Sequence, residues 1–524
     1  MKKFLLLFSI FLSINSFAQH PVDVLHYRFE IEVTDGSDAI TGKAIIKVKF
    51  LENASLVQFD LVSPEDEKGM RVFQVKEGEQ LLQFNQSNDI LSINLATPAK
   101  KGEERSFEIN YMGVPKDGLI ISKNKFGDRT FFGDNWPNRA HNWLPCIDRP
   151  DDKAPFDFIV TAPAQYNIVS NGNKMGETLI GAGSGKIGKR KSYWREVTPL
   201  STKIMVIGIS KFAVKQFADS PPSIPVTAWV YVQDSSQGFY DYGVTPSIVK
   251  FFSNYIAPFP YKKLANVQST TIFGGMENAG AIFYAEGSVT GDRKWEDVYA
   301  HEIVHQWFGD MASEKSFAHL WLSEGFATYL TNIYFEQKYG KDSVARRMLK
   351  DKERVIEFAK QNDHPIVDTT SDLMSLLNAN SYQKGSWVLH MLRNEVGDTV
   401  FRKIIQTYYA QYKGSNADSR DFEAVAEKVS GKELTWFFDQ WLYRGGIPEL
   451  DIEIKKEKDE AKVKITQGKD LYQFHLAIRI ETADGKKINE KILVKDKETE
   501  YKWKGTGPFT ITVDDSDLLY TSKQ

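Results

Sequence analysis

Residues 301–305 read His-Glu-Ile-Val-His, and after eighteen further residues the chain reaches Glu324. Residues four positions apart lie on one face of a helix, so His301 and His305 can hold one metal ion between their imidazole rings. Two neutral imidazoles and a carboxylate suit zinc and leave its fourth tetrahedral position open for water. Glu302 lies beside that position, where it can accept a proton as the water attacks a carbonyl group. This stretch therefore predicts a metal site, a nucleophile and a general base.

The residues around this motif indicate that it lies inside a folded domain. Nonpolar side chains flank both histidines, and Glu324 stands on a second nonpolar segment, 320–334. The alternative is a chance occurrence of His-Glu-x-x-His on an exposed helix, which would need neither feature. The flanking nonpolar residues are Val298, Tyr299, Ala300, Ile303, Val304, Trp307 and Phe308.

The composition is that of a folded protein with several domains. Of the 524 residues, 42% are hydrophobic and 26% charged, and such a length supports roughly two to four domains with sizeable cores. The net charge of −3 provides no basic field for binding nucleic acid. The only cysteine, Cys146, follows Trp143, Leu144 and Pro145, so we expect a buried nonpolar side chain, no internal disulfide and no catalytic thiol.

The N-terminus, residues 1–18, has the features of a signal peptide. Two lysines precede a nonpolar run at 4–14, which is too short to span a bilayer, and a cleavage site with small residues at Ser16 and Ala18 follows. We expect cleavage after Ala18, which leaves Gln19 as the first residue. No cysteine follows the run, which argues against a lipid anchor. The mature protein is expected to be exported to the periplasm or secreted, without a membrane span.

Hydrophobic periodicity divides the rest of the chain into three domains and predicts a multidomain α+β fold. Residues 19–210 alternate with a period of two, as in an antiparallel β domain, with a glycine-rich hairpin tip at 181–188. Residues 211–446 follow a mostly helical period after one strand at 224–232. Alternation returns over 447–524 and predicts a small β sandwich. The predicted helices span 244–256, 296–308, 320–339, 342–359, 381–396, 400–412, 421–429 and 433–444.

A second segment with chemical potential lies at 273–280 and reads Phe-Gly-Gly-Met-Glu-Asn-Ala-Gly. Its glycines allow a backbone to approach a ligand closely. Burying Glu277 in this nonpolar neighbourhood is costly unless a cation meets it, and the α-amine of a peptide is such a cation. The alternative is a turn that closes the edge of a β sheet.

A third segment lies at 381–389 and reads Ser-Tyr-Gln-Lys-Gly-Ser-Trp-Val-Leu. Gly385 follows Tyr382 by three residues, so another element can pack closely beneath the tyrosine. The tyrosine hydroxyl can donate to the oxyanion that forms when water adds to a carbonyl. The alternative is an ordinary core tyrosine.

Together these segments resemble the zinc aminopeptidases of the aminopeptidase N and leukotriene hydrolase family, which are gluzincin metallopeptidases. Order and spacing match as well as content, over roughly residues 20–520. A Pro-Cys-x-Asp-x-Pro signature at 145–150 precedes the catalytic region, and 437–441 resembles the segment that ends it. The other matches are Gly-Gly-Met-Glu-Asn at 274–278, His-Glu-Ile-Val-His-Gln-Trp-Phe-Gly at 301–309, Trp-Leu-Ser-Glu-Gly-Phe-Ala at 321–327 and Tyr-Gln-Lys-Gly at 382–385.

The resemblance implies an N-terminal β domain, a thermolysin-like, mostly helical catalytic domain and a small β sandwich. It implies one zinc ion held by His301, His305 and Glu324, with Glu302 as general base and Tyr382 as oxyanion donor. It also implies a substrate-binding segment in which Glu277 grips the amino terminus of a peptide. That segment comprises Gly274, Gly275, Met276, Glu277 and Asn278.

The chain departs from the family pattern at several positions. The family usually places Gln or Glu ten residues before the signature cysteine, to share the substrate amine, and Trp136 occupies that place. Asp134 and Asn135 are therefore the candidates for a second amine anchor. Asp310 and Ser323 each replace a family asparagine. The large helical C-terminal domain of many relatives has no counterpart, so control of substrate size is expected to differ or to come from another chain.

The sequence thus predicts an exported zinc aminopeptidase that acts on peptides with a free N-terminus. Three alternatives remain open: an endopeptidase that uses the same metal and ignores the amine, a non-catalytic peptide-binding or scaffold protein, and an epoxide hydrolase. The base and the oxyanion tyrosine argue against a silent site, which needs neither. The preferred first residue and the oligomeric state are not predicted.

Overall fold

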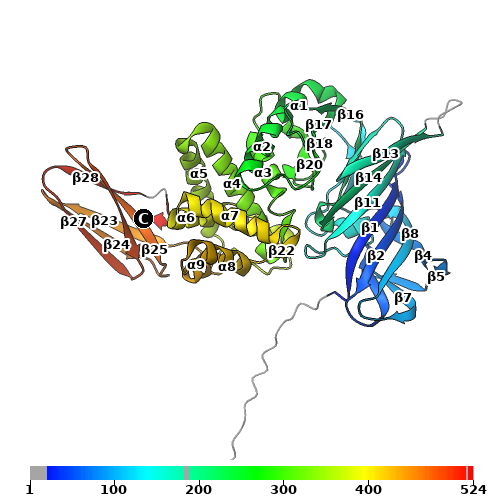
Figure 1. Ribbon diagram of the computed structural model, residues 1–524, viewed down its shortest axis with the longest axis horizontal. Coiled ribbons are helices and arrows are strands. Elements are labelled where there is room, and N and C mark those ends of the chain that lie inside the picture. The colour runs from blue at the N-terminus through cyan, green and yellow to red at the C-terminus, as the bar shows by residue number, and fades with distance from the viewer. Residues whose placement is uncertain (1–19, 182–187, 515–516, 523–524) are drawn as a thin grey trace, which may run out of the picture.

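A computed structural model describes residues 20–181, 188–514 and 517–522. It is an elongated molecule with a β-rich region at each end and the helices between them (Figure 1). The predicted multidomain α+β fold is confirmed. The predicted signal peptide and most of the glycine-rich hairpin tip lie outside the described residues. Within the described part, no helix combines the length and nonpolar composition needed to span a membrane.

The N-terminal region is built on an eight-stranded sheet in the order β13-β14-β11-β1-β2-β8-β4-β5. In β2 the side chains alternate between buried and accessible, as the sequence period predicts. The sheet is antiparallel except that β1 pairs with β11 in parallel. Two smaller sheets, β3-β7-β6 and β12-β15-β10-β9, pack with it. The strands are β1 (Val22–Glu32), β2 (Ile40–Phe50), β3 (Ala54–Asp60), β4 (Gly69–Glu77), β5 (Gln80–Leu81), β6 (Phe84–Ser87), β7 (Ile90–Ala99), β8 (Glu104–Val114), β9 (Leu119–Lys123), β10 (Arg129–Gly133), β11 (Ala154–Pro163), β12 (Asn167–Ser170), β13 (Asn173–Ile180), β14 (Lys189–Leu200) and β15 (Ile207–Ser210).

The middle region starts with a five-stranded sheet in the order β16-β17-β18-β20-β19, against which the first helices pack. The very short strand β19 forms one edge of this sheet, beside helix α3. The strands are β16 (Phe212–Gln216), β17 (Val226–Tyr231), β18 (Leu264–Ser269), β19 (Gly275–Met276), β20 (Ala281–Ala285), β21 (Ala312–Glu314) and β22 (Ser415–Ala417). The α-helices are α1 (Ser235–Asp241), α2 (Thr245–Tyr255), α3 (Glu296–His305), α4 (Trp321–Tyr339), α5 (Lys341–Ala359), α6 (Gly385–Val396), α7 (Asp398–Tyr412), α8 (Ser419–Ser430) and α9 (Thr435–Leu442).

The sequence predicted α2 to α9 and missed the short helix α1. Two of the predicted helices differ from the structure in ways that bear on the site. The helix expected over 296–308 ends at His305, after which the chain turns sharply through Gly309, whose φ is +112°. The helix expected over 381–396 begins with a wider π-helical turn, Asn380–Lys384, before α6. Periodicity does not resolve either feature, because both change the winding of the backbone without changing which residues are nonpolar.

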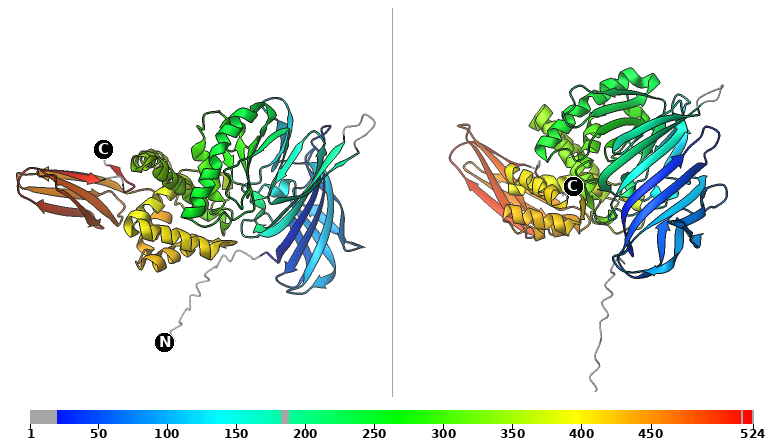
Figure 2. Two further views of the ribbon diagram at one scale, coloured as in Figure 1. Left: turned by 45° about the horizontal axis from the view of Figure 1, so that its top comes forward. Right: turned by 45° about the vertical axis from the view of Figure 1, so that its right-hand side comes forward.

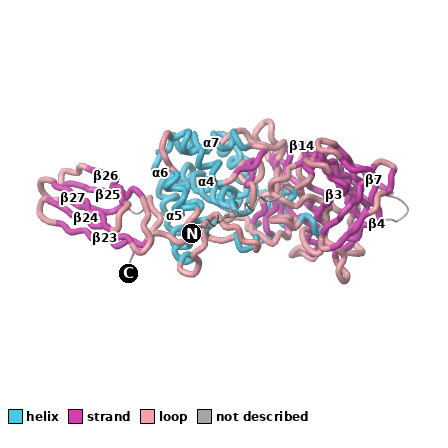
Figure 3. Tube along the Cα trace, turned by 90° about the horizontal axis from the view of Figure 1, so that it is seen from below, coloured by secondary structure: helices cyan, strands magenta, loops and turns pink. Residues whose placement is uncertain are grey.

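The C-terminal region is a small sandwich of two sheets, β27-β24-β23-β29 and β26-β25-β28. Figure 3 shows it at the opposite end of the molecule from the N-terminal strands, with the helices between. Figure 2 shows the sandwich projecting from the helical region. Its strands are β23 (Glu449–Lys456), β24 (Glu460–Gln467), β25 (Phe474–Thr482), β26 (Lys487–Val494), β27 (Glu498–Lys504), β28 (Phe509–Asp514) and β29 (Thr521–Ser522).

Buried charged groups join the N-terminal region to the helical region. Lys203 forms a fully buried ion pair with Glu314 in β21. Lys153 donates hydrogen bonds to the carbonyl oxygens of Asp310 and Met311, at 3.3 and 3.1 Å. Because breaking such pairs leaves uncompensated buried charge, these contacts fix the N-terminal strands against the turn after α3. Cys146 is fully buried and unpaired, as predicted.

Candidate active site

Helices α3 and α4 bring the three predicted metal ligands together. His301 and His305 project from the last turns of α3, and Glu324 from the first turn of α4. The Nε2 atoms of the histidines are 3.1 Å apart, and Glu324 Oε2 lies 3.1 and 3.3 Å from them. Ligand atoms bound about 2.0–2.1 Å from a tetrahedral zinc lie about 3.3 Å from one another. The three atoms therefore have the spacing of one face of a zinc coordination tetrahedron.

The second nitrogen of His305 is held by its neighbours. His305 Nδ1 lies 3.1 Å from the carbonyl oxygen of Phe308 and 3.0 Å from Ser323 Oγ. A proton on Nδ1 that is donated to the carbonyl leaves the Nε2 lone pair free for a metal. A Cβ at Gly309 would lie 2.2 Å from Ser323 Oγ, so the turn needs glycine to make room for this contact. Ser323, where the family has asparagine, thus supports a ligand.

Carboxylates outnumber cations in this buried site. Glu277, Glu302 and Glu324 are each at most 6% exposed. Burial opposes a charge on His305, but Glu324, Glu277 and Glu302 together outweigh it and raise the pKa of His305 to about 10. Burial raises the pKa of Glu302 well above its ordinary value, and the carboxylates of Glu277 and Glu324 add to that effect. Such a donor set lacks positive charge, and a divalent cation supplies it. The residues present therefore fit a zinc ion.

Glu302 packs against the backbone of the short edge strand β19. A Cβ at Gly275 would lie 2.4 Å from Glu302 Oε1, so any larger residue would displace the carboxylate. The glycine therefore lets the carboxylate reach the cleft between α3 and β19. This close approach accounts for Gly275 in the 273–280 segment. The segment does form the edge of a sheet, as the alternative held, but β19 also forms a wall of the cleft.

The π-helical turn at Asn380–Lys384 carries Tyr382 to the metal ligands. The ring of Tyr382 stacks on that of His301 with centroids 5.9 Å apart. Gly385 and Gly325 meet closely enough that a Cβ on either would lie 3.0–3.1 Å from the backbone of the other. This contact lets the turn approach α4, as expected from Gly385. Burial raises the pKa of the Tyr382 hydroxyl well above its ordinary value, so the group stays protonated and can donate.

Glu277 follows strand β19 and packs beside the C-terminal end of α3. The Gln306 side chain donates to the carbonyl oxygen of Glu277 at 2.6 Å and accepts from the amide of Gly280 at 2.7 Å. Asp310 accepts from Gln306 Nε2 at 3.0 Å and so fixes its orientation. Burial raises the pKa of Glu277, and no side chain of the described residues donates a hydrogen bond to its carboxylate. Glu277 is therefore a buried acid without a hydrogen-bonding side chain, although its own backbone amide and the charges of His305 and Lys203 oppose the shift.

One residue of the predicted substrate-binding segment does not reach the cleft. Gly274, Gly275, Met276 and Glu277 line it, but the side chain of Asn278 is fully buried outside it. The chain turns there, with the carbonyl oxygen of Asn278 accepting from the amide of Ala281 at 2.9 Å. Asn278 therefore does not line the cleft, and its part in substrate binding stays a prediction.

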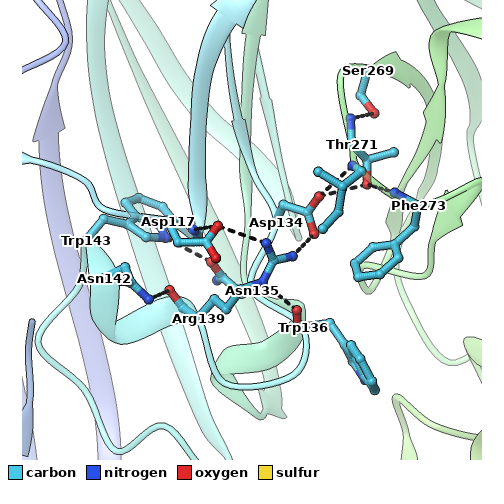
Figure 4. Close-up of polar contacts among 12 residues, drawn as sticks. Asp117, Asp134, Asn135, Trp136, Arg139, Asn142, Trp143, Ser269, Thr271 and Phe273 are labelled. Carbon is cyan, nitrogen blue, oxygen red and sulfur yellow. Dashed lines mark hydrogen bonds and ion pairs between the residues drawn. The ribbon is translucent and has the colours of Figure 1, made fainter. Parts of the chain in front are cut away.

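Neither candidate for the second amine anchor is available to a substrate (Figure 4). Asp134 accepts from Arg139 at 2.6 Å, from Thr271 Oγ1 at 2.8 Å and from the amide of Ile272 at 3.1 Å. Asn135 donates to the carbonyl oxygens of Thr202 and Met205 and accepts from the indole of Trp143. Both side chains are fully buried. They hold loops in place, so the structure gives no support to the expectation that one of them binds the amine.

Trp136 faces the cleft instead. In Figure 4 its indole turns away from the hydrogen-bonded network around Asp134. It meets Phe273 and Phe317 edge to face, with centroids 6.0 and 5.9 Å apart, and is 3% exposed. The amine end of the cleft thus has one carboxylate, Glu277, and an aromatic wall where the family has a second polar group.

The cleft has a volume of about 340 Å³ and extends past the metal ligands to α5. That volume suits a ligand of a few residues. Sequence reasoning missed the α5 wall, where Arg347, Asp351 and Arg354 line the cleft. Their i, i+4, i+7 spacing places them on one face of a helix, which was the available signal for a shared wall. The same spacing is typical of charged residues on a solvent-exposed helix face, so it did not indicate a cleft.

Comparisons with known proteins agree with this architecture. The family model described as "Peptidase family M1 domain" matches residues 240–441. The model described as "Peptidase M1 N-terminal domain" matches residues 23–202. The chain is 27% identical to aminopeptidase M1-C of Oryza sativa subsp. japonica over 69% of this chain and 42% of the relative. It is 25% identical to probable aminopeptidase 2 of Sulfurisphaera tokodaii over 89% of this chain and 60% of the relative. The chain thus spans about half the length of the curated relatives it matches.

A solved structure has the same fold. The M1 zinc metallopeptidase from Deinococcus radiodurans superposes with a TM-score of 0.69 at 22% identity, covering 81% of this chain and 94% of that one. Two models of one family together cover most of the chain, in the order that the fold requires. The chain belongs to peptidase family M1.

Proposed function

We propose that this protein is a zinc-dependent aminopeptidase that hydrolyses the first peptide bond of peptides with a free N-terminus. The observation that carries the proposal is Glu277, a buried carboxylate without a hydrogen-bonding side chain at one end of a cleft that also contains Glu302 and the ligand triad. A buried acid of this kind is costly unless a cation from outside the chain meets it. The α-ammonium of a peptide meets that requirement.

His301, His305 and Glu324 would hold one zinc ion. When bound, the ion supplies a Lewis acid that polarises a carbonyl and lowers the pKa of water. Glu302 removes the proton from the attacking water and passes it to the leaving amine. Its raised pKa suits it to carry that proton between the two steps. The protonated hydroxyl of Tyr382, stacked on His301, donates to the developing oxyanion.

The amine grip decides where the chain is cut. With the ammonium at Glu277, only the first peptide bond lies within reach of Glu302 and Tyr382, because each further residue adds about 3.3 Å. An endopeptidase needs a cleft that continues past this point for the preceding residues. Here the side chains of Trp136 and Phe273 border the same end of the cleft, which supports the proposal of an exopeptidase.

A panel of aminoacyl fluorogenic amides, with free and acetylated amines, tests the function. We expect turnover of the free forms only, loss of turnover with a chelator, and recovery on adding zinc. Equal turnover of acetylated and free substrates would favour the endopeptidase. A protein that binds zinc stoichiometrically but turns over no substrate would be a silent peptide-binding protein.

We also propose export, on the basis of the N-terminal sequence alone. Expression of the full chain with its leader should give a mature protein that starts at Gln19. N-terminal sequencing of the fractionated protein tests this, and a retained N-terminus in the cytoplasmic fraction would contradict it.

A further inference from the structure

The cleft continues beyond the metal ligands, away from Glu277, into an arm that none of the assigned roles uses. The arm lies between the N-terminal end of α3, the middle of α4 and the facing side of α5. Arg347 Nη1 lies 3.7 Å from Asp297 Oδ2, and Arg347 Nε donates to Asn332 Oδ1 at 2.6 Å, so the three helices meet here. The arm is lined by Asp297, Thr328, Thr331, Asn332, Arg347, Asp351 and Arg354.

Helix α3 sets the direction of a bound peptide. Glu277 is fixed at the C-terminal end of α3 through Gln306, and Asp297 stands at the other end of the same helix. Eight residues separate Asp297 from His305, about 12 Å at 1.5 Å per residue. A peptide whose amine meets Glu277 and whose first carbonyl lies at the ligand triad therefore directs its C-terminal part into the arm.

The arm has hydrogen-bond donors that the described residues leave without acceptors. The hydroxyls of Thr328 and Thr331 are buried, and neither has a hydrogen-bond partner in the described part of the chain. Thr331 is 2% exposed, so bulk solvent does not replace that partner. Arg347 uses Nε on Asn332 and faces Asp297 only at 3.7 Å. Arg354 stands exposed at the rim. Two buried hydroxyl groups without acceptors, beside two guanidinium groups, indicate a ligand with acceptor atoms.

The two acids of the arm do not fill that need. Asp297 Oδ1 accepts from the amide of Val298 in its own helix at 3.0 Å. Asp351 accepts from Asn332 at 3.4 Å; burial raises its pKa, and the charges of Arg347 and Arg354 oppose that effect. The guanidinium groups of Arg347 and Arg354 lie on the side of α5 that lines the cleft. Two guanidinium groups therefore stand beside two acids in the arm, within reach of a ligand in the cleft.

We propose that this arm binds the C-terminal carboxylate of short peptides, with Arg347 and Arg354 as the cationic contacts and Thr331 as a hydrogen-bond donor. The proposal rests on the aminopeptidase function and names its substrate class. From Glu324 to Thr331 is about 10 Å along α4, the length of about three extended residues. Tripeptides and tetrapeptides thus place their carboxylate at the arm while the first peptide bond lies at the ligand triad.

The test compares kcat/KM for Leu-Gly-Gly-Gly with that for its C-terminal amide. We expect the free acid to be cleaved about tenfold faster, as one charge-assisted hydrogen bond at a partly exposed site permits, with a preference that falls as salt rises. Arg347→Gln, Arg354→Gln and the double variant should reduce the ratio toward one. Arg354 is exposed, so its replacement leaves the fold intact even if Arg347→Gln does not.

Arg346→Gln is the matched control, because Arg346 is exposed on the same helix and does not line the cleft. It removes the same charge and should keep the wild-type ratio. Equal cleavage of acid and amide by the wild type, or a ratio that survives in the double variant, would overturn the proposal. A Leu-Gly-Gly-Glu amide cleaved as fast as the free acid would also overturn it, because the arm would then recognise an acidic side chain.

Two measurements separate failure of this proposal from failure of the function. Leucine fluorogenic amide carries no carboxylate into the arm, so its turnover by the wild type reports the function alone. Calorimetry with a Leu-Gly-Gly-Gly analogue that has a reduced first bond, as acid and as amide, reports the arm without catalysis. Tighter binding of the acid by the wild type and by Arg346→Gln, but not by the double variant, is the expected result.

Discussion

Asp134 and Glu277 are two buried carboxylates near one loop, and they differ in their partners. Asp134 accepts hydrogen bonds from Arg139, Thr271 and Ile272 (Figure 4). Glu277, at the other end of the loop that starts with Thr271, has no side-chain donor in the described residues. Buried charge persists when it is paired or when its lack of a partner serves binding. Partners, more than burial or residue type, therefore separate a structural acid from a candidate site acid.

The same contrast holds for the whole cleft. The Lys203–Glu314 pair matches one buried charge with its opposite, and it joins the N-terminal region to the helical region. The carboxylates of Glu277 and Glu302 crowd His305 without a complete set of partners. A folded protein keeps such incomplete groups at a cost in stability, so their clustering in one cleft indicates function.

Glu302→Gln should have the largest effect, because it removes the base while keeping the volume against Gly275. We expect a loss of kcat of about a thousandfold or more, with metal content unchanged by mass spectrometry. If the variant loses its metal too, the result reports the ligand triad and says nothing of the base. A fully active variant that retains metal would remove Glu302 from the mechanism.

Glu277→Ala should lower kcat/KM for free-amine substrates by several hundredfold, since a desolvated charge contact is lost. Acetylated substrates, which cannot use the contact, should change little, so the discrimination between the two should nearly vanish. If Glu277→Ala has the kcat/KM of the wild type for free-amine substrates, Glu277 does not bind the amine and its contrast with Asp134 has no functional meaning.

Much of this arrangement could be predicted from the sequence, and the exceptions share one cause. The placement of His301, Glu302 and His305 follows from helical spacing, and Glu324 was inferred as the third ligand from a second nonpolar segment. The role of Tyr382 was implied by the family resemblance, because its own sequence fits a core tyrosine equally well. Whether Asp134 or Trp136 faces the cleft depends on Arg139 and Thr271, which lie on separate loops. The arm on α5 depends on the packing of three helices. Which residues of separate loops and helices come into contact depends on the tertiary structure, and a single sequence shows no local pattern for it.

Tyr382→Phe should reduce kcat by about a hundredfold, the usual effect of removing one oxyanion donor. The ring keeps its stack on His301, so metal binding and KM should change little. Steady-state kinetics at saturating substrate measure the effect. Unchanged kcat would return Tyr382 to the role of a core tyrosine.

Asp134→Asn should have the smallest effect on catalysis and a clear effect on stability. The amide cannot accept from all three donors, and one of its own hydrogens would face Thr271 or Ile272. We expect a loss of about 1–3 kcal/mol in the free energy of unfolding, measured by urea denaturation. Discrimination between free and acetylated amines should stay at the wild-type level.

Asp117→Asn is the control for that variant, because Asp117 is the exposed partner of the same Arg139. Removing this charge should cost less than about 1 kcal/mol, since exposed pairs are screened by water. If Asp134→Asn instead abolished amine discrimination at unchanged stability, Asp134 would be an amine anchor reached by rearrangement of its loop. The presence of hydrogen-bond partners would then no longer separate a buried acid with a structural role from one that binds substrate.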